Sequence, residues 1–366
     1  MKIGIIGTRG IPNRYGGFEQ FAEFLSVFLV ENGHEVFVYN STKHPYQERE
    51  YKGVHIIHKY DPENIIGTVG QFFYDLFCIL DSRKRDFDII LQLGYTSSSI
   101  WSFLFPKKAV IVTNMDGLEW RRAKFNNNVQ RFLMYAEKLA VKKSDHLVSD
   151  SLGIKNYLED KYNINSTFIA YGAEVFQNPD INILKAYNLR KNTYNLIIAR
   201  IEPENNIDVI IKSSFASAQK KPLVVIGDFT RNKYGKRLYA EYGSSEKIIF
   251  LGSIYDKKVL NNLRYHSFIY FHGHSVGGTN PSLLEAMGCS CSIIAHKNEF
   301  NESVLGTEAF YFNTIQDLII SIDSFKEENF GIDKAPLNLE KIYTYYNTKN
   351  INNLYEKLFI RCIQEK

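Results

Sequence analysis

The chain has 366 residues, of which 45% are hydrophobic and 14% aromatic, and this is enough for two domains with sizeable packed cores. Its net charge of +4 is too small to indicate nucleic-acid binding by itself, but it is compatible with anionic ligands or a membrane surface. No run approaches the roughly 18 apolar residues of a membrane span, and the apolar start is broken by Arg9, so no signal peptide is predicted. The four cysteines have neither disulfide nor zinc spacing, so we expect reduced thiols in packed cores and a cytoplasmic protein.

The first half opens with the pattern strand, glycine-rich loop, helix, strand, which the sequence places at 2–6, 7–17, 18–31 and 35–39. This pattern is typical of a doubly wound parallel sheet. The glycines of the loop have the wrong spacing for a nicotinamide-dinucleotide fingerprint, and no acid ends the second strand. Gly16 and Gly17 precede the helix, and we expect them to let the backbone come close to a ligand. A flexible surface loop is the alternative.

Strands and helices continue to alternate as far as Gly172, where we place the end of the first domain. Asp116 and Glu119 follow the strand 109–113, and residues at the carboxyl ends of such strands face the ligand crevice. An acid there would bind a sugar hydroxyl or act as a base, whereas capping of a helix by Asp116 is the alternative. The next helix, 128–143, is amphipathic and basic, which is compatible with an anionic lipid surface or an ordinary solvated face.

The second half repeats the alternation of strands and helices, so the sequence predicts two domains, 1–171 and 172–366. Arg200 stands at the carboxyl end of the strand 195–201 and is a candidate for a bidentate contact with phosphate. An exposed salt bridge with Glu202 or Glu204 is the alternative. The polar tail after residue 312 is predicted to be helical and is long enough to cross back onto the first domain.

The most informative stretch runs from 267 to 289, where an apolar strand, a glycine loop and a helix follow one another. Pro281 suits the first turn of that helix, and Thr279 or Asn280 suits its N-cap. We expect free N–H groups at Asn280, Ser282 and Leu283, which would bind an anion such as diphosphate. Glu285, one turn further, would accept hydrogen bonds from sugar hydroxyls. An ordinary buried turn is the alternative. The pair His272 and His274 has no third metal ligand, so we expect His274 to line the site rather than hold a metal.

Four segments together resemble a retaining glycosyltransferase of family 4, in which two Rossmann-like domains face a cleft in the GT-B arrangement. The segments are Gly7–Glu19, Asn114–Trp120, Pro203–Asn206 and His274–Glu285. They are most similar to a branch that includes bacterial rhamnosyltransferases acting on lipid-diphosphate-linked sugars. Two positions depart from the wider family, because Gly277 stands where a first glutamate is expected and Asn205 stands where a lysine is expected.

The resemblance implies transfer of L-rhamnose from dTDP-rhamnose, or of another sugar from a dTDP- or UDP-sugar, to a lipid-linked saccharide. It implies no metal and no cofactor, a role in polysaccharide biosynthesis, and a place in the cytoplasm at the inner face of the membrane. The alternatives are a GT-B sugar-nucleotide epimerase or hydrolase and a non-catalytic sugar-nucleotide-binding protein. The implied catalytic residues are Asp116 and Arg200. The implied donor-binding residues are Gly16, Gly17, Arg200, Asn205, His274, Gly278, Thr279, Asn280, Pro281, Ser282, Leu283 and Glu285.

Overall fold

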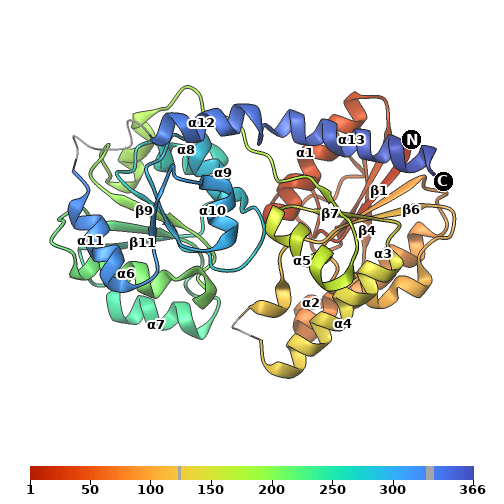
Figure 1. Cartoon of the computed structure of the whole chain (residues 1–366), viewed down its shortest axis with the longest axis horizontal. Helices are drawn as coiled ribbons and strands as arrows, with labels where there is room; N and C mark the ends of the chain where they lie inside the picture. Colours follow the sequence, from red (N-terminus) through yellow and green to blue (C-terminus); the bar gives the residue numbers. More distant parts are fainter. Residues whose placement is uncertain (123–124, 327–333) are drawn as a thin grey trace. The chain divides into compact units, whose positions relative to one another are not determined.

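The computed structural model describes residues 1–122, 125–326 and 334–366, and these fold into two compact units (Figure 1). Of the described residues, the first unit holds 1–121, 125–172 and 348–366, and the second holds 122, 173–326 and 334–347. The chain therefore passes from the first unit to the second at Gly172, next to the position expected from the sequence. The end of the chain returns to the first unit, so the second unit is shorter than the range 172–366.

An eight-stranded sheet forms the centre of the first unit, in the order β3-β4-β2-β1-β5-β6-β7-β8. All neighbouring strands are parallel except β3 with β4. The strands are β1 Lys2–Ile6, β2 Glu35–Ser41, β3 Glu50–Tyr51, β4 Val54–Lys59, β5 Ile89–Leu93, β6 Val110–Asn114, β7 His146–Ser149 and β8 Thr167–Phe168. Strands β5 and β6 are buried along their whole length, because helices cover both faces of the sheet.

The helices of the first unit lie on both faces of its sheet, with α1 and α13 on one side and α3 and α4 on the other (Figure 1). Their bounds, in which η marks a 3₁₀ helix, are α1 Gly17–Glu31, α2 Glu63–Ile66, η1 Gly67–Val69, α3 Gly70–Ser82, η2 Ser99–Leu104, η3 Glu119–Arg121, α4 Asn127–Lys143, α5 Leu152–Tyr162 and α13 Thr348–Gln364.

The last helix, α13, belongs to the core of the first unit. Tyr355 is buried, packs 4.9 Å from the ring of Phe21 and accepts a hydrogen bond of 2.9 Å from the amide of Asn114. The Glu356 carboxylate accepts one hydrogen bond from Asn32 and lies 2.9 Å from His34 Nε2. The predicted return of the tail to the first domain is therefore confirmed.

The second unit is built on a six-stranded parallel sheet in the order β11-β10-β9-β12-β13-β14. The strands are β9 Asn195–Ile198, β10 Leu223–Ile226, β11 Ile248–Gly252, β12 Tyr270–His272, β13 Ile293–His296 and β14 Phe310–Phe312. Figure 1 shows α8, α9 and α12 on one side and α6, α7 and α11 on the other. The helices are η4 Ile181–Tyr187, η5 Pro203–Asn205, α6 Ile207–Ala216, α7 Lys233–Tyr242, α8 Lys257–Tyr265, α9 Pro281–Gly288, α10 Glu299–Leu305, α11 Ile315–Ser324 and α12 Lys334–Thr344. Two doubly wound parallel α/β domains are thus confirmed.

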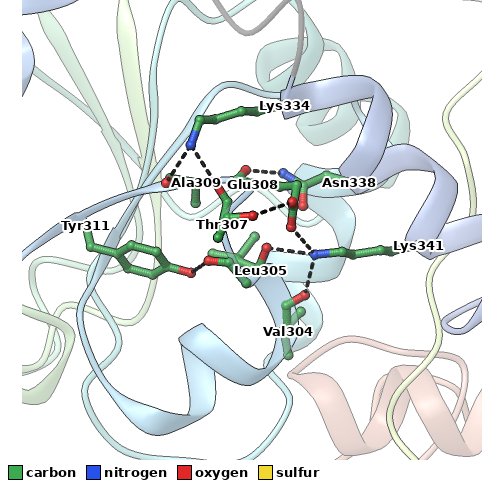
Figure 2. Close-up of polar contacts among 10 residues, drawn as sticks. Val304, Leu305, Thr307, Glu308, Ala309, Tyr311, Lys334, Asn338 and Lys341 are labelled. Carbon is green, nitrogen blue, oxygen red and sulfur yellow. Dashed lines mark hydrogen bonds and ion pairs between the residues drawn. The ribbon is translucent and has the colours of Figure 1, made fainter.

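Lysine side chains of α12 attach this helix to the end of α10, as Figure 2 shows. The Lys341 ammonium donates to the carbonyls of Val304 and Leu305, which end α10, and pairs with Glu308 at 2.7 Å. The amide of Asn338 donates to the Glu308 carbonyl at 2.7 Å. A cation at a helix C-terminus satisfies carbonyls that the helix leaves without partners, so these contacts fasten the chain to the second unit before it returns to the first.

One helical stretch is more apolar than the sequence analysis indicated. The helical stretch Glu63–Ser82 is long and apolar enough to cross a membrane by length and composition alone. Its residues Tyr74, Cys78 and Ile79 are nevertheless buried in the core that covers the first sheet. The Tyr74 hydroxyl also donates to the carbonyl of Tyr39 at 2.9 Å. One side of this helical stretch is therefore packed into the core of the first unit.

Candidate functional site

The site in the second unit lies where two adjacent strands of its sheet end. Strands β9 and β12 are neighbours, with Tyr270 opposite Leu196, but they come from different halves of the unit, and the chain winds away from them in opposite directions. Open parallel sheets bind ligands at this switch point, outside the carboxyl ends of the strands. Arg200 follows β9 and His274 follows β12, so the fold brings these two predicted residues together.

Hydrogen bonds join the loops that follow β9 and β12. The amide of Asn206 donates to the Gly273 carbonyl at 2.8 Å, and the N–H and hydroxyl of Ser275 donate to the Glu204 carbonyl at 3.0 and 2.8 Å. A Cβ atom at Gly273 would lie 2.1 Å from the Asn205 carbonyl oxygen, so only glycine allows this approach. The two loops therefore form one surface at the end of the sheet.

Arg200 presents its side chain on that surface. The residue is exposed. Within the described part of the chain it forms no ion pair, so the alternative of a salt bridge with Glu202 or Glu204 does not hold. Its carbonyl accepts a hydrogen bond of 2.7 Å from the amide of Asn205, whose side chain is buried. The Asn205 side chain thus supports the loop from within, whereas the Arg200 guanidinium remains available for an anion.

At the start of α9, the N–H groups that lack an acceptor in the described part of the chain are not the set that the sequence predicts. Asn280 is the N-cap, and its side chain accepts the Ser282 N–H at 2.9 Å while its carbonyl accepts the Leu283 N–H at 3.0 Å. The expectation of free N–H groups at Ser282 and Leu283 is therefore wrong, because the capping asparagine occupies both. Within the described residues, the N–H groups that meet no acceptor here belong to Gly277, Gly278 and Asn280.

The glycine loop ahead of α9 owes its shape to Gly277. This residue has a φ of +134°, which a residue with a side chain rarely adopts, and nothing lies within 4 Å of the position of a Cβ atom. The space beside Gly277 is therefore open, and of the three N–H groups that meet no acceptor among the described residues, only that of Asn280 is predicted from the sequence. An anion site formed by Gly277, Gly278, Asn280 and Arg200 agrees with this geometry.

Glu285 has a partner that the sequence did not indicate. Its Oε2 atom lies 2.6 Å from a guanidinium nitrogen of Arg264, which comes from α8 and is only 2% exposed. Arg264 also donates to the Ser282 hydroxyl at 3.2 Å and to the Asn261 side chain at 3.1 Å. Burial by itself would lower the pKa of Arg264, but the charge of Glu285 and its neighbours raises it above the usual value. Arg264 therefore carries a permanent positive charge beneath the first turn of α9.

The two histidines beside this loop are neutral. The rings of His272 and His274 stack with their centres 4.5 Å apart. Burial lowers the pKa of His272 to about 3. Burial, the neighbouring His272 ring and the charge of Arg200 together lower the pKa of His274 well below its usual value. The His274 carbonyl accepts hydrogen bonds from Asn298 and Asn301. His274 thus adds an uncharged ring to the edge of the site, next to Arg200.

In the first unit, Asp116 lies in the loop that follows β6 with a φ of +47°, a left-handed conformation that aspartate adopts more readily than most residues. Its N–H donates to the Asn114 side chain at 2.9 Å. The helix α4 begins after Asn126, whose side chain accepts the Val129 N–H, so Asp116 does not cap that helix.

A buried carboxylate holds the end of the same loop. Glu137 is 1% exposed and accepts hydrogen bonds from Trp120 at 3.2 Å, from Tyr157 and Tyr162 at 2.7 Å, and from the ammonium of Lys161 at 2.9 Å. Nothing in its surrounding sequence distinguishes Glu137 from a solvated residue of an amphipathic helix. Its network fixes one end of the segment that contains Asp116.

The conformation of the loop between β1 and α1 does not require glycine at the predicted positions. Gly16 has extended backbone with a φ of −167°, and Gly17 is the first residue of α1. The loop is supported instead by Glu19, which is buried and accepts the Arg9 N–H at 2.9 Å.

Comparisons with known proteins agree with this architecture. Residues 181–341 match the family described as glycosyl transferases group 1, and residues 1–174 match a domain of unknown function, DUF1972. An uncharacterized glycosyltransferase of Methanocaldococcus jannaschii is 25% identical to the chain, and the alignment covers 99% of both proteins.

Solved structures of the GT-B fold superpose on the whole chain. Sucrose-phosphate synthase from Thermosynechococcus elongatus has a TM-score of 0.83 at 15% identity, and all of both chains is covered. Anabaena HepE, solved with UDP and glucose, has a TM-score of 0.76 at 15% identity over 99% of this chain and 100% of its own. The fold and the group 1 domain together identify the chain as a glycosyltransferase with the GT-B fold.

Proposed function

We propose that this glycosyltransferase transfers L-rhamnose from dTDP-rhamnose to a hydroxyl of a lipid-diphosphate-linked saccharide, with retention of configuration, in the synthesis of a bacterial surface polysaccharide. The observation that carries the proposal is the placement of Arg200 beside the glycine loop at the switch point of the second sheet. The sugar and the acceptor come from the resemblance of the four motif segments to the rhamnosyltransferase branch.

The nucleotide diphosphate would bind at the second unit. Arg200 would contact the diphosphate through its guanidinium, and the N–H groups of Gly277, Gly278 and Asn280 would donate to the same oxygens. Negative charge grows on the leaving diphosphate in the transition state, and donors already fixed in place stabilise it there. These groups supply the positive potential that a metal ion supplies in other transferases, so we propose a reaction without a metal.

Glu285 would accept hydrogen bonds from the ribose hydroxyls, and Arg264 holds its carboxylate at 2.6 Å in position for this. Thr279, Pro281, Ser282 and Leu283 would shape the site through the turn that they build. The Ser282 side chain contacts Arg264 and the hydroxyl of Tyr270, so its role would be to support the pocket from below.

The first unit would bind the acceptor, with Asp116 and the loop that contains Gly16 and Gly17 near the sugar. No protein nucleophile is proposed, because in a same-face reaction the leaving phosphate takes the proton of the acceptor hydroxyl. The enzyme would work in the cytoplasm at the inner face of the membrane, where lipid-linked saccharides are available.

A thermal-shift panel with dTDP-, UDP- and GDP-sugars tests the donor, because a ligand that binds only the folded state raises the melting temperature. We expect dTDP-rhamnose to give the largest rise and Arg200→Ala to abolish it. A larger rise with a UDP-sugar would show that this UDP-sugar, and not dTDP-rhamnose, is the donor. No rise with any sugar nucleotide would contradict the site itself.

The glycine at 277 and the asparagine at 205, which replace an expected glutamate and lysine, favour a second candidate, a sugar-nucleotide-binding protein without transferase activity. It predicts tight donor binding and no transfer to any acceptor. A GT-B epimerase or hydrolase would instead consume the donor at full rate in the absence of an acceptor.

A further inference from the structure

An unusually apolar side of the first unit faces solvent at helix α3. Val69, Phe73, Phe77 and Leu80 recur every three or four residues, so they lie on one side of the helical stretch, and between 36% and 55% of each is exposed. The opposite side of α3 packs into the core of the unit through Tyr74, Cys78 and Ile79. An ordinary surface helix carries polar residues on its outer side, so this arrangement needs an explanation.

The exposed apolar surface continues onto two neighbouring elements. Phe103 of η2 is 71% exposed, and its neighbour Trp101 donates a hydrogen bond of 2.8 Å to the Phe72 carbonyl of α3. The ring of Phe132 on α4 lies 5.7 Å from that of Phe72. In Figure 1, α3 and α4 lie on the same side of their sheet. The apolar face of α3, η2 and α4 consists of Ile65, Ile66, Val69, Phe73, Phe77, Leu80, Phe103, Val129, Phe132 and Tyr135.

The charged residues around this apolar face are strongly biased. In the segments 63–85, 99–108 and 127–143, every exposed charged side chain is a cation. These cations are Arg83, Lys84, Lys107, Lys108, Arg131, Lys138, Lys142 and Lys143.

The carboxylates of the same segments are withdrawn from the surface. Asp75 and Glu137 are buried, Glu63 forms a pair of hydrogen bonds with Arg9, and Asp81 binds Lys59 and Arg85. Exposed cations therefore outnumber exposed carboxylates around the apolar face. The exposed carboxylates Asp86, Asp88 and Asp145 lie just beyond these segments, and Asp86 pairs with Lys108 at 3.3 Å.

We propose that the apolar face of α3, η2 and α4 docks on the surface of a lipid bilayer that contains anionic headgroups. The side chains of α3 would enter the boundary between headgroups and acyl chains, and the cations of α4 and of the segments beside α3 would contact the headgroups. The stretch 63–82 does not span the bilayer, because its inner side is part of the folded core. The inference rests on the proposed function insofar as a lipid-linked acceptor would lie in the same membrane.

Lipid is favoured over a second copy of the chain by the charge distribution. Two identical faces would place their cations against each other in a symmetric dimer, and this would be repulsive. An anionic bilayer instead complements both the apolar side chains and the cations. Failure of the chain to bind anionic vesicles would point instead to a protein partner with an acidic border.

The test measures binding of the full chain to sedimenting vesicles of phosphatidylcholine, with and without phosphatidylglycerol. We expect binding that needs phosphatidylglycerol and weakens with added salt. The double variant Phe73→Ser, Phe77→Ser should bind at least tenfold more weakly. Its matched control, Phe215→Ser with Ile320→Ser, removes apolar side chains from the second unit that are at least as exposed, and it should bind like the parent protein.

A charge variant tests the cations separately. Lys138→Gln with Lys142→Gln should weaken binding to anionic vesicles about thirtyfold, since each cation near such a surface contributes about 1 kcal/mol. Lys220→Gln with Lys258→Gln removes the same charge from the second unit, where both side chains are exposed, and should have little effect.

The proposal is overturned if the parent protein does not bind anionic vesicles or if Phe73→Ser, Phe77→Ser binds as the parent does. It is also overturned if sedimentation velocity shows a dimer that this variant dissociates while neither protein binds vesicles. Thermal shifts with sugar nucleotides are measured on all variants and should be unchanged. Vesicle binding without any response to sugar nucleotides would refute the proposed function while leaving the docking surface intact.

Discussion

Replacing Arg264 by methionine tests the ion pair beneath α9. The guanidinium is 2% exposed, lies 2.6 Å from Glu285, and donates to Ser282 at 3.2 Å and to Asn261 at 3.1 Å. Methionine keeps much of the volume but leaves the Glu285 carboxylate without this cation in a site where its side chain is only 16% exposed. Removing one partner of a buried ion pair costs about 3–5 kcal/mol, and the residual exposure of Glu285 places this pair at the lower end.

A loss of about 3 kcal/mol would lower the melting temperature of a unit of this size by about 6–12 °C. Scanning calorimetry of the parent protein and of Arg264→Met gives this shift. The control is the same substitution in a chain that carries Glu285→Leu. There the carboxylate is absent, and the penalty for removing Arg264 should fall by about 2 kcal/mol, because the coupling between the two charges has gone.

Two results would refute this reasoning. One is a melting temperature of Arg264→Met within about 2 °C of the parent value, which would mean that the buried guanidinium contributes little net stability. The other is an equal penalty in the parent and in the Glu285→Leu background, which would mean that the effect comes from packing of the side chain and not from the pair.

Three further substitutions test other parts of the structure. Arg200→Ala should lower turnover by about 100- to 1,000-fold without changing the melting temperature, because the residue is exposed. The control is Arg190→Ala, which removes another exposed arginine. Near-normal turnover of Arg200→Ala would exclude Arg200 from the diphosphate site. Burial raises the pKa of Asp75 to about 7, although the hydrogen bond that Asp75 accepts from Ser97 acts in the opposite direction and lowers the pKa. The folded state then holds a proton that the unfolded state releases near pH 4, so the free energy of unfolding should fall as the pH rises from about 4 to 7. Asp75→Asn should remove this pH dependence. An identical pH dependence of the variant in urea titrations would show that Asp75 does not cause it. Lys341→Met should cost about 1–3 kcal/mol in urea unfolding, because three hydrogen bonds at the end of α10 are lost, and an unchanged midpoint would mean that they contribute nothing.

Local features of the chain could be predicted because local chemistry decides them. Asn280 is the N-cap of α9 and Pro281 stands in its first turn, as the preference of asparagine for caps and the missing N–H of proline predict. The same local chemistry explains the error about Ser282 and Leu283, whose N–H groups the Asn280 cap uses.

The partner of Glu285 could not be predicted, because it comes from another helix. Arg264 and Glu285 lie on α8 and α9, and only the packing of these helices on one face of the sheet brings them together. An arginine just before the buried strand β12 is a weak signal by itself, since long cationic side chains usually extend to solvent near such positions.

By itself, the sequence determined the alternation of strands and helices, and therefore two doubly wound sheets, because apolar periodicity and turn residues act over a few residues. It also determined that Arg200 and the glycine loop follow strands. Only the tertiary structure decided that these strands are neighbours, that Arg264 is buried under Glu285, and that one side of α3 faces solvent. Helix α3 carries apolar residues on both of its sides, so its sequence does not show which side is covered, and packing against the sheet alone decides this.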